Sequence, residues 1–419
     1  MKQIVRKILG NRLYTFLKMI WQSLKRMYIL IIWKYYSNYF IENKIKEIRN
    51  KDRIKVAFVI HELGSWKTEE LYRKMLSHKR FEPLLLVAES LDSTFSKPLV
   101  ISYFKEKNYN YYELSSNKSV CCQFHPDIIF YQKPYMGMVP RKLMFWNNTE
   151  ALFCYVYYSF RNKKLKTSQD ALIHRFIWQE YVENDVVKRE LEELMSNKAS
   201  NVFVTGLPVM DELLKDKSNY PNPWHESPIT KKKIIYAPHH SIYSDVGLWS
   251  TFMVYADFML EMVEKYKEKV QWAFKPHPLL YTKLCNVWGE EKTDNYYNKW
   301  RTLENCQLEE GPYMGLFKHS DAMIHDCGSF MLEYHYTKNP VLYLMQNSQA
   351  EIPINEQTIE AKKAHYQGWN KEDVEKFIIN VINENDSMKE VRTSFYEKYL
   401  LPPNNQTACD NIMNLILGD

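Results

Sequence analysis

Short apolar runs alternate with amphipathic segments over most of this chain, and the alternation predicts its secondary structure. A first series predicts helices at residues 67–76 and 211–214 and strands at residues 54–60, 81–88, 127–131, 152–158 and 201–205. A second series predicts helices at residues 248–266 and 371–400 and strands at residues 233–237, 270–274, 321–325 and 341–344. Strands that alternate with helices indicate an α/β fold built on parallel sheets.

A polar, proline-rich stretch separates the two series. Residues 218–233 contain Pro221, Pro223 and a Lys triplet, a composition typical of an interdomain linker. We therefore expect two Rossmann-like halves that face a cleft, the usual ligand site between such halves. The predicted division is an arm at 1–53, a first domain at 54–217, the linker at 218–233, a second domain at 234–385 and C-terminal helices at 386–419.

The first 33 residues carry apolar side chains at helical spacing, with Lys and Arg between them. This pattern predicts an amphipathic basic helix or a helix pair. The longest unbroken apolar run, residues 27–33, is far shorter than the ~20 residues that a spanning helix needs. We interpret the arm as an interfacial helix on an anionic membrane surface, and the alternative is a helix that packs on the body with a solvated basic face.

Charge and cysteine content narrow the function classes. Residues 1–53 carry 13 Lys and Arg against 3 acidic residues, a net charge of +10, whereas the whole chain is +6. The remainder is therefore about −4, which disfavours a nucleic-acid-binding body. The 7 cysteines form no CxxC pair and no Cys/His spacing typical of zinc sites, so they indicate a reducing cytosol.

The segment at residues 326–333 is the most informative in the chain. It follows the apolar run at 321–325 with Asp326-Cys-Gly-Ser and continues as a helical pattern. Ligands bind at such strand ends in α/β sheets, and a helix N-terminus suits a phosphate. Gly328 allows close approach of the backbone, while Ser329 is placed to cap the helix or to donate to a phosphate oxygen.

Polar groups also follow two earlier strands of the second series. His239, His240 and Ser241 follow the strand at 233–237, and Lys275 and His277 follow the strand at 270–274. Because the carboxyl ends of parallel strands lie at one edge of the sheet, we expect these groups to converge with residues 326–329. A cation, imidazoles, a hydroxyl and a helix start together predict a cradle for an anion such as a diphosphate.

Several common catalytic motifs do not occur in the sequence. It contains no GxxxxGK[ST], no GxGxxG after the first strand, no HExxH and no acidic pair at metal-ligand spacing. A kinase or a metalloprotease is therefore disfavoured, and neither a bound metal nor a cofactor is indicated.

Short motifs in both halves follow a recognisable order. The second half contains Tyr-Ala-Pro at 236–238, Lys-Pro-His-Pro at 275–278, His-Asp-Cys-Gly-Ser-Phe-Met-Leu-Glu-Tyr at 325–334 and Asn-Pro-Val at 339–341. The first half contributes residues 126–135 and 204–211. Over roughly residues 54–385 the chain resembles the CDP-glycerol glycerophosphotransferase family, the teichoic-acid and capsule polymerases and primases with a GT-B fold.

The resemblance implies that an acceptor hydroxyl attacks the β-phosphate of a CDP-polyol such as CDP-glycerol or CDP-ribitol and releases CMP. The acceptor would be a glycan or a lipid-linked molecule, and the protein would lie peripherally on the cytoplasmic face of the bacterial plasma membrane. The second domain would bind the donor: His277 and Lys275 would contact its phosphates, Ser329 its diphosphate, and Glu333 the sugar of its nucleotide. Asp326 is expected to orient its loop.

The first half departs from the family pattern. The family's Trp-His-Gly-Thr stretch, which supplies a candidate base, is replaced by Tyr-Val-Tyr-Tyr-Ser-Phe at 155–160. The candidate bases are therefore His239, His240 and His61, since an imidazole takes a proton near neutral pH. Tyr158 or Ser159 is expected to line the acceptor site. Two alternatives remain: a GT-B glycosyltransferase that uses a nucleotide sugar, and a catalytically inactive membrane scaffold of the same fold.

Overall fold

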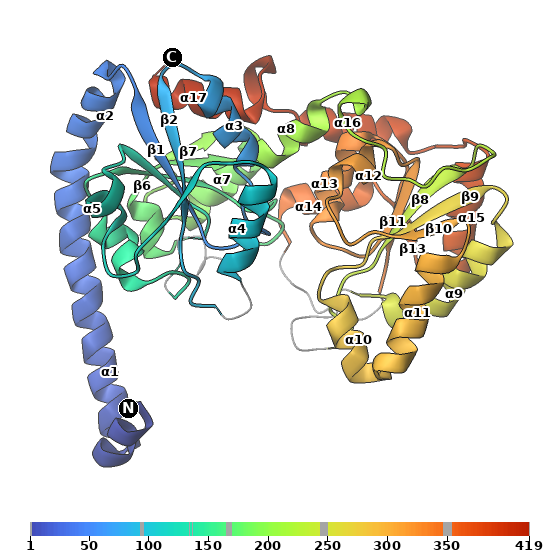
Figure 1. Cartoon of the computed structure of the whole chain (residues 1–419), viewed down its shortest axis with the longest axis horizontal. Helices are drawn as coiled ribbons and strands as arrows, with labels where there is room; N and C mark the ends of the chain where they lie inside the picture. Colours follow the sequence, from blue (N-terminus) through green and yellow to red (C-terminus); the bar gives the residue numbers. More distant parts are fainter. Residues whose placement is uncertain are drawn as a thin grey trace.

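The computed structural model of the protein shows two lobes, each built on a parallel β-sheet (Figure 1). The structure describes residues 2–92, 96–133, 135, 137–164, 170–243, 250–346 and 354–418, and for residues 2–12, 14 and 38 it describes the backbone alone. Neighbouring strands within both sheets pair in parallel. The predicted α/β fold with two parallel sheets is confirmed.

The first lobe carries a seven-stranded sheet in the order β3-β2-β1-β4-β5-β6-β7. Its strands are β1 Ile54–Ile60, β2 Phe81–Val87, β3 Tyr111–Glu113, β4 Ile128–Tyr131, β5 Leu152–Val156, β6 Ile177–Val182 and β7 Val202–Val204. Its helices are α3 Glu69–Ser77, α4 Lys97–Glu106, α5 Val120–Phe124, α7 Asp185–Leu194 and α8 Pro208–Leu214. Buried residues on both faces of the central strands form two separate apolar clusters, which explains why these strands read as unbroken apolar runs.

The second lobe carries a six-stranded sheet in the order β10-β9-β8-β11-β12-β13. Its strands are β8 Lys232–Ala237, β9 Val270–Phe274, β10 Cys306–Leu308, β11 Ala322–His325, β12 Val341–Leu344 and β13 Tyr366–Gly368. Its helices are α9 Phe252–Lys265, α10 Leu280–Trp288, α11 Glu290–Thr302, α12 Met314–Lys318, α13 Phe330–Glu333, α14 Glu356–Lys363 and α15 Lys371–Ile382. The centre of this sheet places β8 between β9 and β11, so the three strand ends that carry the predicted site are adjacent.

Most of the predicted strands are confirmed, and the differences have local causes. Strand β6 was not predicted because Gln179 and Glu180 interrupt its apolar run, although both side chains are buried. The helix predicted at 371–400 is two helices, α15 and α16 (Lys389–Tyr399), with a break at residues 383–388. The helix predicted from residue 248 begins at Phe252, and residues 248 and 249 lie outside the described part of the chain.

The C-terminal segment returns to the first lobe. Helix α16 packs on the second lobe, whereas α17 (Ala408–Leu417) packs against α3 and α8 of the first lobe. Asp211 on α8 accepts the N–H groups of Ala408 and Cys409 at 2.8 and 2.9 Å, so a first-lobe carboxylate binds the start of α17. The chain therefore crosses between the lobes twice, which connects them by more than the linker.

The crossing is closely packed at Gly206, at the end of β7. Its φ is +82°, and a side-chain carbon there would lie 3.1 Å from the ring of Pro402 and 3.2 Å from Ala408. We expect Gly206→Ala to lower the free energy of unfolding by about 2–4 kcal/mol, since strain and overpacking add. Gly289→Ala is the control, because Gly289 has a similar φ of +83° but open space around it. Urea denaturation of both variants measures the difference, and equal losses would contradict the packing argument.

The first 33 residues belong to a single helix, the first of the two predicted alternatives, and a second helix follows it. Helix α1 (Lys2–Tyr35) leads through a π-helical turn at Tyr36–Phe40 into α2 (Ile41–Asn50). Figure 1 shows α1 along the outer side of the first lobe, with its N-terminal end extending beyond the sheet. Tyr36 fixes the helix to the lobe, because its ring is buried and its hydroxyl donates to the carbonyl of Ala151 at 2.9 Å.

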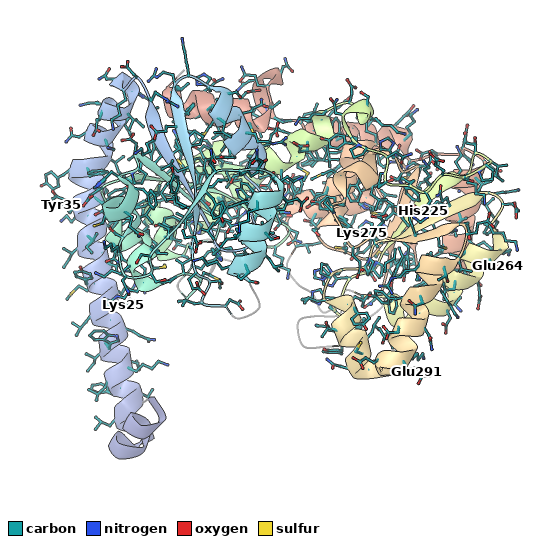
Figure 2. All side chains as sticks on the ribbon, in the orientation of Figure 1. Lys25, Tyr35, His225, Glu264, Lys275 and Glu291 are labelled. Carbon is teal, nitrogen blue, oxygen red and sulfur yellow. The ribbon has the colours of Figure 1, made fainter. Side chains whose placement is uncertain are left out.

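The outer face of α1 is apolar and exposed. Tyr35, labelled in Figure 2, points away from the lobe and is 67% exposed. The other exposed large apolar residues of α1 are Leu13, Phe16, Leu17, Met19, Ile20, Trp21, Leu24, Met27, Tyr28 and Ile31. Among the described residues no helix has a stretch both long and apolar enough to cross a bilayer.

Candidate active site

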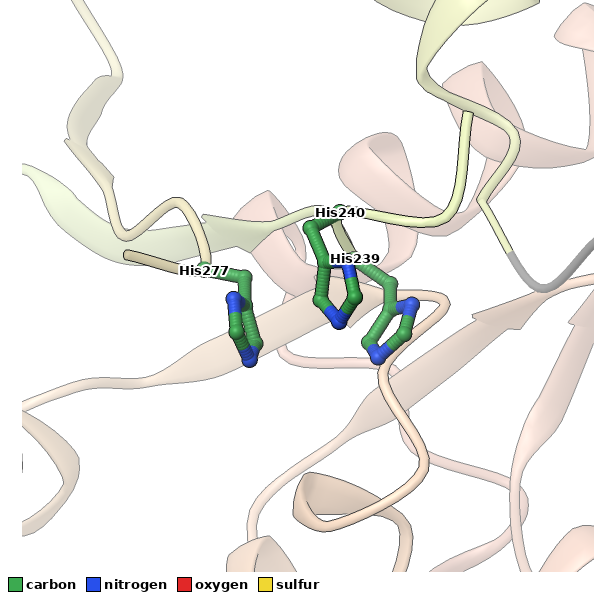
Figure 3. A group of neighbouring side chains, drawn as sticks. All are labelled: His239, His240 and His277. Carbon is green, nitrogen blue, oxygen red and sulfur yellow. The ribbon is translucent and has the colours of Figure 1, made fainter. Parts of the chain in front are cut away.

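Three histidines come together where β8 and β9 end. His239 and His240 follow β8, and His277 follows β9, so the three imidazoles lie side by side (Figure 3). The ring centroids of His240 lie 4.3 Å from His239 and 4.1 Å from His277, and those of His239 and His277 are 5.3 Å apart. The parallel pairing of β8 with β9 thus produces the convergence that the sequence predicted for these two strand ends.

Backbone N–H groups determine the tautomers of two of these rings. Nδ1 of His239 accepts the N–H of Ser241 at 3.2 Å, and Nδ1 of His277 accepts the N–H of Leu279 at 3.1 Å. A neutral imidazole that accepts a hydrogen bond at Nδ1 carries its proton on Nε2. His239 and His277 are therefore hydrogen-bond donors at Nε2.

Burial keeps both rings neutral. It lowers the pKa of His239 to about 3, with further lowering by His240 and His277 and smaller contributions from Lys283 and Lys163. It also lowers the pKa of His277 to about 4, with contributions from His240, Lys283 and Lys275. Neutral N–H donors that lie in a field of lysines suit an anionic ligand.

The same cluster is the candidate metal site of the described residues. One nitrogen from each of His239, His240 and His277 lies within 4.8 Å of the other two. A metal-bound imidazole offers a lone pair to the ion and donates its other N–H to the protein. His239 and His277 have the reverse arrangement, because their Nδ1 atoms accept from backbone N–H groups. The cluster therefore fits an anion better than a metal ion.

Asp326 connects the loops around the cluster. Its Oδ1 accepts the N–H of His239 at 2.5 Å, and its Oδ2 accepts both the N–H and the hydroxyl of Thr251, at 2.5 and 2.9 Å. The side chain is fully buried, and burial raises the pKa of its carboxyl to about 6 although these donors oppose the rise. Because its oxygens are engaged by the protein, Asp326 is placed to orient the loops and not to contact a donor.

The turn after β11 differs from the predicted helix start. Helix α13 is a single turn, Phe330–Glu333, and continues as a 3-10 helix at Tyr334–Thr337. Ser329 makes no capping hydrogen bond, and its hydroxyl lies 3.3 Å from Sγ of Cys327. Of the two roles predicted for Ser329, the side-chain cap is not observed, and donation to a phosphate stays a prediction. So short a helix contributes little dipole field to a phosphate.

Gly328 is the point where the first lobe reaches this turn. A side-chain carbon at Gly328 would lie 3.2 Å from Nδ2 of Asn162, so the absence of a side chain permits the approach. Lys163, which follows Asn162 in the chain, forms an antiparallel backbone bridge with Ile354 of the second lobe. The segment at 161–163 thus lies across the end of the second sheet.

Lys275 and Glu333 are both buried in the second lobe. The ammonium of Lys275 donates to the carbonyl of Gly311 at 2.8 Å, and burial lowers its pKa. Burial raises the pKa of Glu333, which Lys67 of the first lobe and Tyr313 counteract. The carboxyl of Glu333 is therefore close enough to Lys67 of the first lobe and Tyr313 of the second for both to lower its pKa. The ammonium of Lys275 instead faces the carbonyl of Gly311.

The acceptor-side candidates lie at the strand ends of the first lobe. His61 follows β1 and is 1% exposed, and neither of its ring nitrogens has a hydrogen-bond partner among the described residues. Burial lowers its pKa to about 4. Tyr158 is exposed beneath Lys133, whose Nζ is 4.9 Å from the ring centroid, and Ser159 is half-buried beside it. These residues and the histidine cluster come from different lobes.

Sequence reasoning missed the basic segment at 161–164. Arg161 is buried, and its carbonyl accepts the side-chain amides of Asn355 and Gln357 at 2.5 Å each. Arg161 also lies over the ring of Tyr157, 4.2 Å from its centroid, and the hydroxyl of Tyr157 donates to Glu180. The available signal was the run Arg-Asn-Lys-Lys directly after the aromatic stretch that replaces the family's first-half motif.

Three buried histidines contact one another next to the turn at residues 326–329. Nε2 of His325 lies 3.1 Å from Nε2 of His365, and Nδ1 of His365 lies 3.2 Å from Nε2 of His335. Nδ1 of His325 accepts the N–H of Cys327 at 3.2 Å, which connects the three histidines to the loop. Burial lowers the pKa of all three rings, to about 4 for His365.

These shifts predict a loss of stability in acid. Between pH 6.5 and about 4 the unfolded chain protonates these histidines while the folded chain does not, so the free energy of unfolding falls as the pH falls. Each group contributes up to about 1.4 kcal/mol per pH unit. We expect His335→Leu to reduce this slope by up to one proton in urea denaturation at pH 7, 6 and 5. The exposed His225→Leu serves as the control, and an unchanged slope in His335→Leu would contradict the prediction.

Several solved structures share this fold. The wall teichoic acid polymerase TagF aligns with a TM-score of 0.58 and 12% identity over 96% of this chain and 98% of that chain. The UDP-GlcNAc 2-epimerase of Neisseria meningitidis, bound to UDP-GlcNAc, aligns with a TM-score of 0.57 and 14% identity over 87% and 100%. The S. aureus MnaA–UDP structure aligns with a TM-score of 0.56 and 15% identity over 87% and 96%. These likenesses confirm the predicted GT-B fold.

The sequence comparisons identify the family. The search of curated proteins gave no match. The family model for CDP-glycerol:poly(glycerophosphate) glycerophosphotransferase matches residues 153–418, which is more than half of the chain. The matched region includes the histidine cluster, the turn at 326–329 and the whole second sheet. The chain therefore belongs to the CDP-glycerol:poly(glycerophosphate) glycerophosphotransferase family, as its motifs predicted, and is a transferase of that type.

Proposed function

We propose that this protein transfers a polyol phosphate from a CDP-activated donor to a glycan or a lipid-linked acceptor and releases CMP. The observation that carries the proposal is the pair of Nε2–H donors on His239 and His277, placed by backbone contacts at the edge of the second sheet. Lys163 of the first lobe and Lys283 of the second both contribute to the positive field at His239. These groups suit the diphosphate of a nucleotide-activated donor.

The proposed chemistry is a phosphoryl transfer. The acceptor oxygen forms a bond to the β-phosphorus while the bond from that phosphorus to the bridging oxygen of CMP breaks. The acceptor hydroxyl gives its proton to a base, and CMP leaves as a phosphate monoester. The Nε2–H groups of His239 and His277 donate to the phosphate oxygens on which charge develops, so they act more strongly in the transition state than in the ground state.

The tautomers narrow the choice of base. His239 and His277 already hold a proton on Nε2, which leaves His240 and His61 among the predicted imidazoles. His61 stays neutral because burial lowers its pKa to about 4, and both its nitrogens lack a protein partner in the described part of the chain. Its place at the end of β1 supports a role on the acceptor side, with Tyr158 and Ser159.

We further propose that the first lobe binds the acceptor and the second lobe the donor. The limits we propose are 54–217 and 234–385, with the linker at 218–233 and the terminal helices at 386–419. The separation of the acceptor-side candidates from the histidine cluster supports this division. Segment 161–163 would then contact both substrates, since it follows the acceptor-side residues and reaches Gly328.

A peripheral location on the cytoplasmic face of the bacterial plasma membrane completes the proposal. The exposed apolar stripe of α1 supports it, because large exposed apolar patches mark interaction surfaces. Lys34, an exposed cation of the same helix, would contact anionic headgroups. Such an enzyme would build a cell-envelope polymer, either teichoic acid or capsule.

Incubation with CDP-glycerol, CDP-ribitol or a UDP-sugar, each with a lipid-linked acceptor, tests the donor class. We expect CMP release and product from a CDP-polyol and none from the UDP-sugar. Product from the UDP-sugar alone would indicate a glycosyltransferase on this fold. Binding of no nucleotide at all, measured as thermal stabilisation, would support the inactive scaffold.

A further inference from the structure

A cavity of about 800 Å³ lies between helix α1 and the first lobe. Lys18, Trp21, Lys25 and Ile29 line it from the helix, and Trp146 and Arg175 line it from the lobe. Its lining contains none of the residues assigned to the transfer reaction. Lys25, labelled in Figure 2, lies on this helix, and its Nζ is 5.1 Å from the ring centroid of Trp146.

The polar lining of the cavity is cationic. Lys18, Lys25, Arg26 and Arg175 line it, whereas Asp170 is the one acidic residue among the described residues of the lining. Oδ1 of Asp170 accepts the N–H and the hydroxyl of Ser196, at 2.9 and 2.8 Å, so neutral donors hold this oxygen. The surplus of cations indicates an anionic occupant.

The remaining lining is apolar and aromatic. Ile29, Phe145 and Trp146 are buried by the packing of α1 on the lobe, and Trp21 stands at the edge with 64% of its surface exposed. A free phosphate would use the cations but not this wall, and a neutral hydrocarbon would use the wall but not the cations. A ligand that uses both is an amphiphile with an anionic head.

We propose that this cavity binds a single anionic membrane phospholipid, with its phosphate among the Lys and Arg side chains and its chain against the aromatic wall. The cavity opens beside the exposed apolar stripe of α1, because Trp21 belongs to both. A lipid could therefore enter from the surface on which the helix lies. The inference rests on the proposed membrane association and adds to it a saturable site of defined stoichiometry.

The test uses the full chain and dihexanoyl phosphatidylglycerol below its critical micelle concentration, measured by calorimetry. We expect saturable binding of one molecule per chain, with dihexanoyl phosphatidylcholine and inorganic phosphate each at least about tenfold weaker. The phosphatidylcholine arm tests the need for net negative charge, and the phosphate arm tests the need for the chain. Equal binding of both phospholipids, or full competition by phosphate, would overturn the proposal.

Variants locate the site. Lys25→Gln and Arg175→Gln should each weaken binding by about fivefold, the effect of removing one cation near a lipid phosphate. Ala171→Trp fills the cavity without a change of charge and should abolish binding. Lys34→Gln is the matched control, since Lys34 is exposed on the same helix and does not line the cavity. A loss with Lys34→Gln equal to that with Lys25→Gln would overturn the proposal, because it would show a diffuse charge effect.

Sedimentation with phosphatidylglycerol vesicles distinguishes membrane association of the chain from lipid binding in the cavity. A chain that sediments with vesicles but shows no saturable binding of the short-chain lipid refutes the cavity and retains membrane association. A chain that does neither refutes both. Ala171→Trp should still bind vesicles but should no longer bind the short-chain lipid. If this variant lost both activities, the cavity would serve membrane association in general, and the single-lipid site would be overturned.

Discussion

Replacing His277 by Ala is expected to lower the turnover of the CDP-polyol by about a hundredfold or more, because it removes an N–H donor from the developing charge. The Nδ1 contact with the N–H of Leu279 holds that donor in place in the intact protein. The measurement is kcat for CMP release at saturating donor. His225→Ala is the control, since His225 is exposed and its hydrogen bonds to Gln307 and Gln271 involve its backbone.

A second substitution at the same position separates a donor from a base. The variant His277→Gln would place an amide N–H near the position that Nε2 of the imidazole occupies. If His277 donates to phosphate, His277→Gln should retain at least about tenfold more activity than His277→Ala. If His277 is the base, both variants should lose activity equally. Turnover by His277→Ala within about twofold of the parent would contradict the proposed site.

Replacing Phe16, Trp21 and Ile31 together by Ser is expected to weaken binding to anionic vesicles by about a hundredfold or more. These side chains are 58%, 64% and 63% exposed on the outer face of α1. Each contributes about 1.5–3 kcal/mol when fully buried in an apolar phase, and partial insertion at an interface retains a fraction of that. Sedimentation with vesicles over a series of lipid concentrations measures the change.

The control variant removes exposed apolar side chains elsewhere. Leu99 and Val254 are 64% and 67% exposed on other helices, so Leu99→Ser with Val254→Ser changes the hydrophobicity of the surface without changing α1. Substitution is preferable to deletion of residues 1–50, because Tyr36 and Ile48 are buried and Lys44 pairs with Asp127 at 2.9 Å. Vesicle binding that survives the triple replacement would refute the proposed role of α1.

The convergence of three histidines could be predicted because strand ends are a property of local sequence. An apolar run that ends in Pro-His-His-Ser or Lys-Pro-His-Pro places its polar residues at the edge of a parallel sheet, wherever the strand lies. Adjacency of β8 and β9 then brings His239, His240 and His277 together. The pattern did not predict that Lys275 donates to the carbonyl of Gly311, since that contact depends on a loop 36 residues away.

Buried polar networks explain the largest omission in the fold. Strand β6 contains Glu180, which is fully buried and accepts from Tyr157 while it pairs with His174 at 2.8 Å. Pairing makes this burial tolerable, but a pattern of apolar residues reads Gln179 and Glu180 as solvent-exposed. The partners of Glu180 become visible only once the strands β5 and β6 lie side by side.

By itself the sequence determined the alternation of strands and helices, the division into two halves and the amphipathic arm, because each depends on local periodicity and composition. It also determined the family, because short motifs identify it. The tertiary structure alone decided the tautomers of His239 and His277, the reach of Asn162 to Gly328 and the return of α17 to Asp211. Each of these depends on the position of a backbone N–H or a side chain from another segment. Hydrogen-bond direction and close packing are set by distances in space, which spacing along the chain does not specify.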